Sequence, residues 1–128
     1  MARNLTVRLA EDRPGALAEL VETLSRAGVN IEGITEVQGT VHLLVKNPPP
    51  ARTALRGAGY QLEDEKEVVV MPMTDRPGEL TMVVRDLAEA GVNINFLYIA
   101  TGTRIVIGTD DVVKARQVLA DRSPASHN

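Results

Sequence analysis

The sequence predicts an α+β protein made of two ferredoxin-like units, each with its elements in the order β-α-β-β-α-β. The 128-residue chain repeats itself at an offset of 63 residues, which indicates two copies of one unit. Within each copy a strand pattern leads into an amphipathic helix, and a strand hairpin follows that helix. Such a unit has an antiparallel sheet with helices on one face, and we expect the second copy to lack a clear fourth strand.

Two motifs establish the repeat. Asp12–Gly15 reads Asp-Arg-Pro-Gly, and the same four residues return at positions 75–78. Ala27–Ile31 reads Ala-Gly-Val-Asn-Ile and returns as Ala90–Ile94. Packing explains why apolar positions match between the copies, but the repeated aspartate, glycine and asparagine require a separate reason.

The first copy begins with a strand and a helix. Apolar and polar residues alternate from Leu5 to Leu9, the period of a half-buried strand. Pro14 suits the first position of a helix because its missing N–H would be unpaired there, and Gly28 suits the left-handed residue that ends one. We therefore expect a helix over residues 14–27, whose apolar stripe is Leu17, Leu20, Val21 and Leu24.

A hairpin and a second helix complete this copy. The pattern predicts a strand with one face made of Val29, Ile31, Thr35 and Val37. A turn at Gly39 and a third strand over Thr40–Val45 follow, and Gly39-Thr40 aligns without a gap on Gly102-Thr103. Asn47 suits the N-cap of a helix over residues 51–58, because the three prolines at 48–50 fit only a first turn. A fourth strand then begins at Tyr60–Leu62.

The second copy follows the same order up to its last helix. We expect the helix at 111–120 to be capped by Asp110, and the polar residues after it show no strand pattern. Without a fourth strand, the first strand of this copy is a sheet edge that can pair with the other copy or with a second chain. The expected elements are Val68–Met71, Pro77–Ala90, Val92–Ala100, Thr103–Ile107 and Asp111–Ala120.

Units of about 60 residues lie near the smallest size at which a core is stable, so the two halves should pack on each other. The charged segment Glu63–Glu67 interrupts the apolar pattern and marks the boundary. We expect one domain at residues 1–64, a second at 65–121 and a flexible tail at 122–128.

Composition restricts the class of function. The chain is 44% hydrophobic and 24% charged, with a net charge of −3 and a pI near 5.4, which is typical of a soluble globular protein. A net negative charge gives no electrostatic attraction to nucleic acid or to an anionic membrane. There is no cysteine, no signal peptide and no membrane-spanning run, so we expect a cytoplasmic protein without disulfides.

The polar residues kept in both copies are complementary to a free amino acid. The first turn of a helix offers unpaired N–H groups and a partial positive charge, which suit a carboxylate. Aspartate accepts from an ammonium group, asparagine pairs with either end of a zwitterion, and glycine lets a ligand approach the backbone. The candidate ligand-binding residues are Asp12, Arg13, Gly15, Asn30, Asp75, Arg76, Gly78 and Asn93.

Each motif alone also has a structural explanation. Asp-x-Pro-Gly is an adequate helix start, and Gly-x-Asn is a common helix exit. The turn and the asparagine of one copy lie at opposite ends of the same helix, so they do not form a site by themselves. If two units associate side by side, the turn of one can face the asparagine of the other and enclose a shared pocket.

Both motifs in both copies resemble the ACT domain, a small-molecule sensing module attached to many enzymes of amino-acid biosynthesis. The resemblance implies side-by-side association into a continuous sheet and amino acids bound between units. It carries ligand contacts over to Asp12, Gly15 and Asn30, and to Asp75, Gly78 and Asn93. Ala10 and Met73 stand where serine-sensing members have a histidine. With no enzyme attached, the chain looks like a free-standing tandem ACT protein.

Other chemistry finds less support. A split βαβ enzyme resembling acylphosphatase uses an arginine in this turn with an asparagine nearby, which makes Arg13 and Arg76 the basis of a hydrolase alternative. Exposed arginines that pair with surface acids are the structural explanation. His42 and His127 have no partner at ligand spacing, so we expect no metal, no cofactor and no catalytic residue.

The sequence therefore predicts a non-catalytic sensor that binds a free amino acid at the contact between units and regulates amino-acid metabolism. Its expected partners are a second copy of the chain, as a homodimer, and a regulated metabolic enzyme. The alternative is an assembly module whose interface is filled by side chains and binds no ligand.

Overall fold

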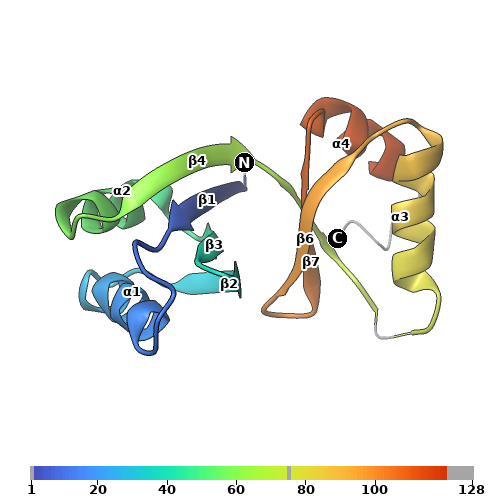
Figure 1. Ribbon diagram of the computed structural model, residues 1–128. Helices are drawn as coiled ribbons and strands as arrows, with labels where there is room; N and C mark the ends of the chain where they lie inside the picture. The colour runs from blue at the N-terminus through green and yellow to red at the C-terminus, as the bar shows by residue number, and fades with distance from the viewer. Residues whose placement is uncertain (1, 75, 121–128) are drawn as a thin grey trace. The chain divides into compact units, whose positions relative to one another are not determined.

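The structure is a computed structural model, and it describes residues 2–74 and 76–120 (Figure 1). The chain forms two compact units, one from Ala2 to Lys66 and one that begins at Glu67. Each unit has its own hydrophobic core. The expected flexible tail at 122–128 and the stretch after the last helix, where we expect no fourth strand, lie outside the described residues. No described helix has the length and apolar character needed to cross a bilayer.

The first unit has the predicted order β-α-β-β-α-β, and the predicted α+β fold class is confirmed. Strand β3 pairs antiparallel with both β1 and β2, and the strand order in this unit is β4-β1-β3-β2. Both helices cover one face of the sheet (Figure 1). The elements are β1 (Arg3–Arg8), α1 (Ala16–Arg26), β2 (Ile31–Val37), β3 (Thr40–Val45), α2 (Pro48–Gly57) and β4 (Gln61–Glu67).

The core of this unit follows from the alternation seen in the sequence. Leu5 and Val7 of β1 are fully buried against the helices. Leu20 and Leu24 of α1, one turn apart, fill the same core together with Leu55 of α2. Because successive strand residues point to opposite faces, the residues between them on β1 lie on the face without helices.

The predicted start of the first helix is wrong by two residues. Helix α1 begins at Ala16, and Pro14 lies in the preceding turn. Gly15 is the N-cap with φ +89°, a left-handed conformation that glycine adopts without steric cost. The predicted role of Gly28 is confirmed: its φ is +74°, and the N–H of Val29 donates to the Leu24 carbonyl at 3.0 Å.

The predicted common face of the second strand is also wrong. A β-bulge lies between Ile31 and Gly33, and it changes which residues face the helices. Ile31 packs on the core, whereas Thr35 lies opposite His42 on the helix-free face. Val37 is 66% exposed. The same irregularity recurs between Ile94 and Phe96 in the second unit.

The second unit repeats the arrangement with strand order β6-β7-β5 among the described residues. Strand β7 pairs antiparallel with β5 and β6. Helix α4 starts one residue later than predicted, because the side chain of Asp111 rather than Asp110 caps it by accepting from the Lys114 N–H at 3.0 Å. The elements are β5 (Val69–Pro72), α3 (Glu79–Glu89), β6 (Ile94–Ala100), β7 (Arg104–Thr109) and α4 (Val112–Ala120).

The two hairpins differ by one residue. Val37 pairs with Thr40 across a two-residue turn, but Ala100 pairs with Arg104 across three residues. The extra residue therefore lies in the turn at 101–103, and the gapless match of Gly39-Thr40 with Gly102-Thr103 does not hold in structure. Beyond this turn, equivalent positions are 64 residues apart.

The charged segment at the expected domain boundary lies within β4. Glu65 accepts from Arg3 Nε at 2.8 Å and from the Nε and Nη2 atoms of Arg52 at 2.8 and 2.9 Å. These arginines come from β1 and α2, so one carboxylate joins three elements of the first unit. In the second unit Arg116 of α4, the equivalent of Arg52, donates to Glu67 at 3.1 Å.

Candidate functional site

The first repeated turn connects β1 to α1 and is held by its own charged residues. Arg13 donates from Nη2 to both carboxylate oxygens of Glu19, at 3.2 and 3.1 Å, and its Nε lies 3.3 Å from Glu11 Oε2. Asp12 is exposed, and none of the hydrogen bonds among the described residues involves its side chain. Its Cβ lies 3.9 Å from the position a Cβ would take on Gly39, so Asp12 adjoins the β2–β3 turn.

The second repeated turn is closed by different residues. Asp75 lies outside the described residues. Glu79 accepts from the backbone N–H of Thr74 at 3.0 Å and from the Thr74 hydroxyl, while Arg76 Nη2 lies 3.8 Å from the same carboxylate. Glu79 occupies the position of Ala16 in the first unit, so each turn has a glutamate from its own helix but from a different site on it.

Both turns leave the start of the following helix open. Among the described residues no side-chain cap is found at α1 or α3, and Gly15 and Gly78 adopt nearly the same left-handed conformation, with φ +89° and +88°. A Cβ on Gly78 would have no atom within 4 Å. The glycines are thus required by backbone conformation, and the space beside Gly78 is empty among the described residues. Uncapped N–H groups at a helix start are suited to a carboxylate.

The repeated asparagines lie at the other end of the same helices. Asn30 and Asn93 follow α1 and α3, are exposed, and take part in none of the hydrogen bonds among the described residues. Each helix has 11 residues and is therefore about 16 Å long at 1.5 Å per residue. The structure does not bring the turn and the asparagine of one unit together. A pocket shared between units stays a prediction.

A small cavity of about 110 Å³ adjoins the first turn. Arg13 and Glu19 line it with Tyr60, which lies just before β4. Sequence reasoning did not single out Glu19 or Tyr60. A signal for Glu19 existed, because an acid in the first turn of a helix stabilises the helix dipole and is within reach of an arginine in the preceding turn.

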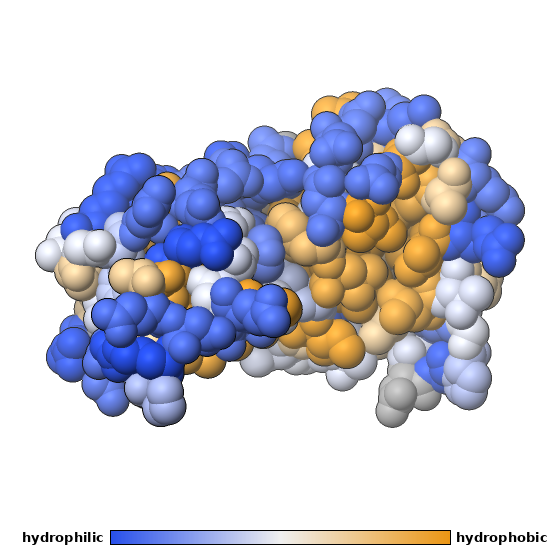
Figure 2. All heavy atoms as spheres, in the orientation of Figure 1, coloured by the Kyte–Doolittle hydropathy of each residue, from blue (hydrophilic) through white to orange (hydrophobic). Residues whose placement is uncertain are grey.

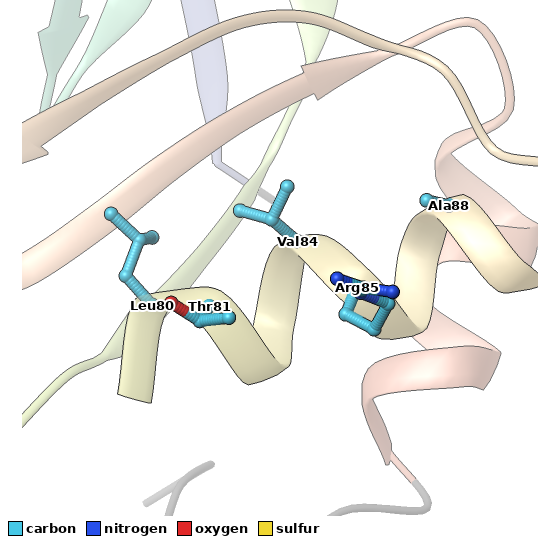
Figure 3. Close-up of a pocket in the computed structure, with 5 residues that line it drawn as sticks. All are labelled: Leu80, Thr81, Val84, Arg85 and Ala88. Carbon is cyan, nitrogen blue, oxygen red and sulfur yellow. The ribbon is translucent and has the colours of Figure 1, made fainter. Parts of the chain in front are cut away.

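A groove of about 380 Å³ runs along α3 of the second unit. Leu80 and Val84 project from the same side of the helix, 38% and 37% exposed, with Arg85 beside them (Figure 3). Hydrophobic residues gather on this unit in the space-filling view (Figure 2). The equivalent residues of α1, Leu17 and Val21, pack on the core of the first unit. None of the predicted site residues lines this groove, which begins two residues after Gly78.

The described residues of the two turns offer hydrogen-bonding groups to a ligand. Within residues 2–74 and 76–120, no three histidine, cysteine, aspartate or glutamate side chains cluster in a way that could hold a metal ion. Both turn arginines are engaged with carboxylates of their own unit, as the structural explanation of these residues requires. In the hydrolase alternative, an acyl phosphate substrate would have to displace Glu11 and Glu19 from Arg13.

Comparison with known protein families finds one match. Residues 4–38, which include the first turn and Asn30, match the ACT domain. No curated protein matches the chain by sequence.

Solved structures match nearly the whole chain. Protein BT0572 from Bacteroides thetaiotaomicron is 28% identical, with a TM-score of 0.76 over 93% of this chain and 86% of that one. The regulatory subunit of aspartate kinase from Thermus flavus is 16% identical, with a TM-score of 0.69 over 93% and 90%. A structure of aspartokinase alpha and beta subunits is 20% identical, with a TM-score of 0.68 over 92% and 89%. The two aspartate kinase matches establish a shared fold.

Proposed function

We propose that this chain, which carries an ACT domain and repeats the ACT fold in its second unit, is a non-catalytic, cytoplasmic regulatory protein that binds a free amino acid. The amino acid would occupy a contact between ACT units, with its carboxylate at an uncapped helix start and its ammonium group at an aspartate. Its occupancy would be passed on to an enzyme of amino-acid metabolism.

The observation that carries this proposal is the repeated turn. Gly15 and Gly78 precede α1 and α3 in the same left-handed conformation, and neither helix has a side-chain cap from the part of the chain that the structure describes. Side chains of the site are exposed where the structure describes them, and those of Asp12, Asn30 and Asn93 have no hydrogen bond among the described residues. A stability role alone does not require polar side chains to be left available in both copies.

The comparisons support the regulatory part of the proposal. The match to the ACT domain family covers the first turn, the helix after it and Asn30. Regulatory subunits of aspartate kinase share the fold over most of their length, which supports a partner enzyme in amino-acid metabolism. The bound amino acid, the contact between units and a homodimeric state are the proposed features that experiment has to establish.

Isothermal titration calorimetry of the full chain against each of the twenty amino acids tests the binding. We expect one of them to bind, and Asn30→Ala and Asn93→Ala each to weaken binding by about 1 to 3 kcal/mol, because the ligand loses a polar partner. That loss corresponds to about 5-fold to 150-fold in Kd.

Asn47→Ala is the matched control, because Asn47 is an exposed asparagine before α2 whose side chain makes no cap hydrogen bond. Its affinity should equal that of the wild type. Binding that is unchanged in both site variants would move the site elsewhere on the protein.

An assembly module without ligand is the second candidate, and the exposed apolar side of α3 favours it. Leu80 and Val84, one turn apart, are 38% and 37% exposed, and contiguous exposed apolar surface can mark an interaction site. Flat titrations for all twenty amino acids, together with a sedimentation coefficient that rises with protein concentration, would favour assembly over sensing.

A further inference from the structure

We propose that Asn4, Thr6 and His42 form a proton-sensitive latch between β1 and β3, closed when the imidazole is neutral and opened when it is protonated. This inference concerns the helix-free face of the first sheet and does not rest on the proposed amino-acid site. His42 is flanked in register by Thr6 on β1 and by Thr35 on β2, so it sits in the middle of that face.

The three side chains form a short chain of hydrogen bonds. The Asn4 amide donates from Nδ2 to Thr6 Oγ1 at 3.0 Å. His42 Nδ1 lies 3.2 Å from Thr6 Oγ1 and 3.4 Å from Asn4 Nδ2. Asn4 is fully buried and Thr6 is 9% exposed, so water does not readily replace these bonds.

The donors around His42 Nδ1 favour a neutral imidazole. An amide nitrogen can only donate, and the Thr6 hydroxyl, which accepts from Asn4, keeps its own proton for donation. The Asn4 amide offers a proton to His42 Nδ1 and the Thr6 hydroxyl can offer its own, so both bonds are satisfied when Nδ1 acts as an acceptor. The imidazole then carries its proton on Nε2 and is neutral.

Protonation reverses this arrangement. An Nδ1–H would face the Asn4 N–H, donor against donor, and the Thr6 hydroxyl would have to accept from Nδ1 and turn its own proton to another acceptor. Unsatisfied buried donors are unfavourable, so the strands would have to shift or the side chains to turn. The side-chain hydrogen bonds that join β1 to β3 on this face would open.

The surrounding charges act in both directions. Burial and the Lys66 ammonium lower the pKa of His42 from its ordinary value of 6.5, while the Asp64 carboxylate raises it. Both charged residues are on β4. Arg8, on the same face of β1, is paired with Glu63 at 3.4 Å. Because the folded pKa is depressed, the latch contributes its full stability above pH 6.5 and loses it as the pH falls below that value.

The test uses the full chain and its two histidines. Proton NMR follows the imidazole signals from pH 8 to pH 4, and His127→Gln assigns them. We expect His42 to titrate below pH 6.5, and urea unfolding to show lower stability at pH 5 than at pH 7.5. His42→Gln should remove much of that difference, whereas His127→Gln should keep it.

Thr6→Val separates the latch from simple burial. If Thr6 donates to Nδ1, removing its hydroxyl destabilises the neutral imidazole and the His42 signal titrates at higher pH than in the wild type. If burial alone depresses the titration, the added methyl group makes it titrate lower still. A lower value in Thr6→Val, or a wild-type His42 that titrates at or above pH 6.5, would overturn the proposal, and neither result requires His42→Gln to fold.

Discussion

Gly108 shows how one residue type depends on its neighbour across a sheet. Phe96 on β6 lies directly opposite Gly108 on β7, and its ring covers the glycine. A Cβ added to Gly108 would be 2.3 Å from Phe96 Cζ. In the first unit the equivalent pair is exchanged: Gly33 lies on β2 and the large residue, Leu44, lies on β3. The two copies thus keep one large and one small residue at this place.

Gly108→Ala is expected to destabilise the protein by about 1 to 3 kcal/mol, because the added Cβ would force the Phe96 ring out of its packed position. Gly57→Ala is the matched control, since Gly57 is helical and a Cβ there would meet no atom within 4 Å. That substitution should stabilise the protein by about 0.5 to 1 kcal/mol. Urea unfolding measures both, and equal effects at the two glycines would contradict the contact.

Thr109 is a buried polar residue at an apolar position. It is 3% exposed, and its hydroxyl has no hydrogen-bond partner among the described residues. The equivalent residue of the first unit, opposite Ile31, is Val45. Thr109→Val should raise the free energy of unfolding by about 1 kcal/mol, because a desolvated hydroxyl is replaced by a methyl group. The opposite change, Val45→Thr, should lower it, and a destabilised Thr109→Val would indicate a bound water or another partner.

At the scale of the elements, ion pairs hold β4 against the rest of the first unit. Its side chains are mostly polar, and only Leu62 packs against the core. Glu65 compensates for this by accepting from α2 and from β1 through Arg52 and Arg3. Its side chain is 17% exposed, so these bonds are less screened than those of a surface pair.

The hydrogen bond from Arg52, and then that from Arg3, lower the pKa of Glu65 from its ordinary value of 4.5. A depressed carboxylate pKa stabilises the fold above pH 4.5, and that contribution is lost as the pH falls through the folded value. Glu65→Gln should therefore flatten the dependence of stability on pH between 6 and 3. Urea unfolding at several pH values measures it. Glu63→Gln, at a more exposed carboxylate, should leave most of the dependence in place.

For the whole molecule, the repeat has produced two separate cores. Leu24 and Leu87 are equivalent residues, each fully buried, and they belong to different hydrophobic clusters. Each Leu→Ala change should cost about 2 to 5 kcal/mol, because it leaves a cavity. Since the two residues share no core, the double variant should equal the sum within about 0.5 kcal/mol. A clear deviation in urea unfolding would show that the cores are coupled.

The element order of the first unit was predictable because local patterns specify it. Alternation defined β1, the Leu17 to Leu24 stripe defined α1, and Gly28 ended that helix as expected. The bulge after Ile31 was not predictable, because an extra residue in one strand is tolerated only through its pairing with the partner strand. For the same reason Thr35 and Val37 were assigned to the wrong face.

The candidate site was likewise predictable only in part from the sequence. Repetition, side-chain chemistry and the resemblance to the ACT domain singled out the residues, and the match at residues 4–38 contains Asp12, Gly15 and Asn30. The partners of Arg13 and the uncapped start of α1 needed three-dimensional positions, because Glu19 reaches back six residues to the turn.

The sequence by itself determined the repeat, the kinds of element and their order, because hydrophobic period and turn residues act over a few neighbouring positions. Only the tertiary structure decided which hydroxyls and imidazoles are buried, which carboxylate joins β1, α2 and β4, and which strand carries the large residue at an exchanged pair. Those features depend on atoms far apart in the chain, whose distances are set only when the sheet and helices have packed.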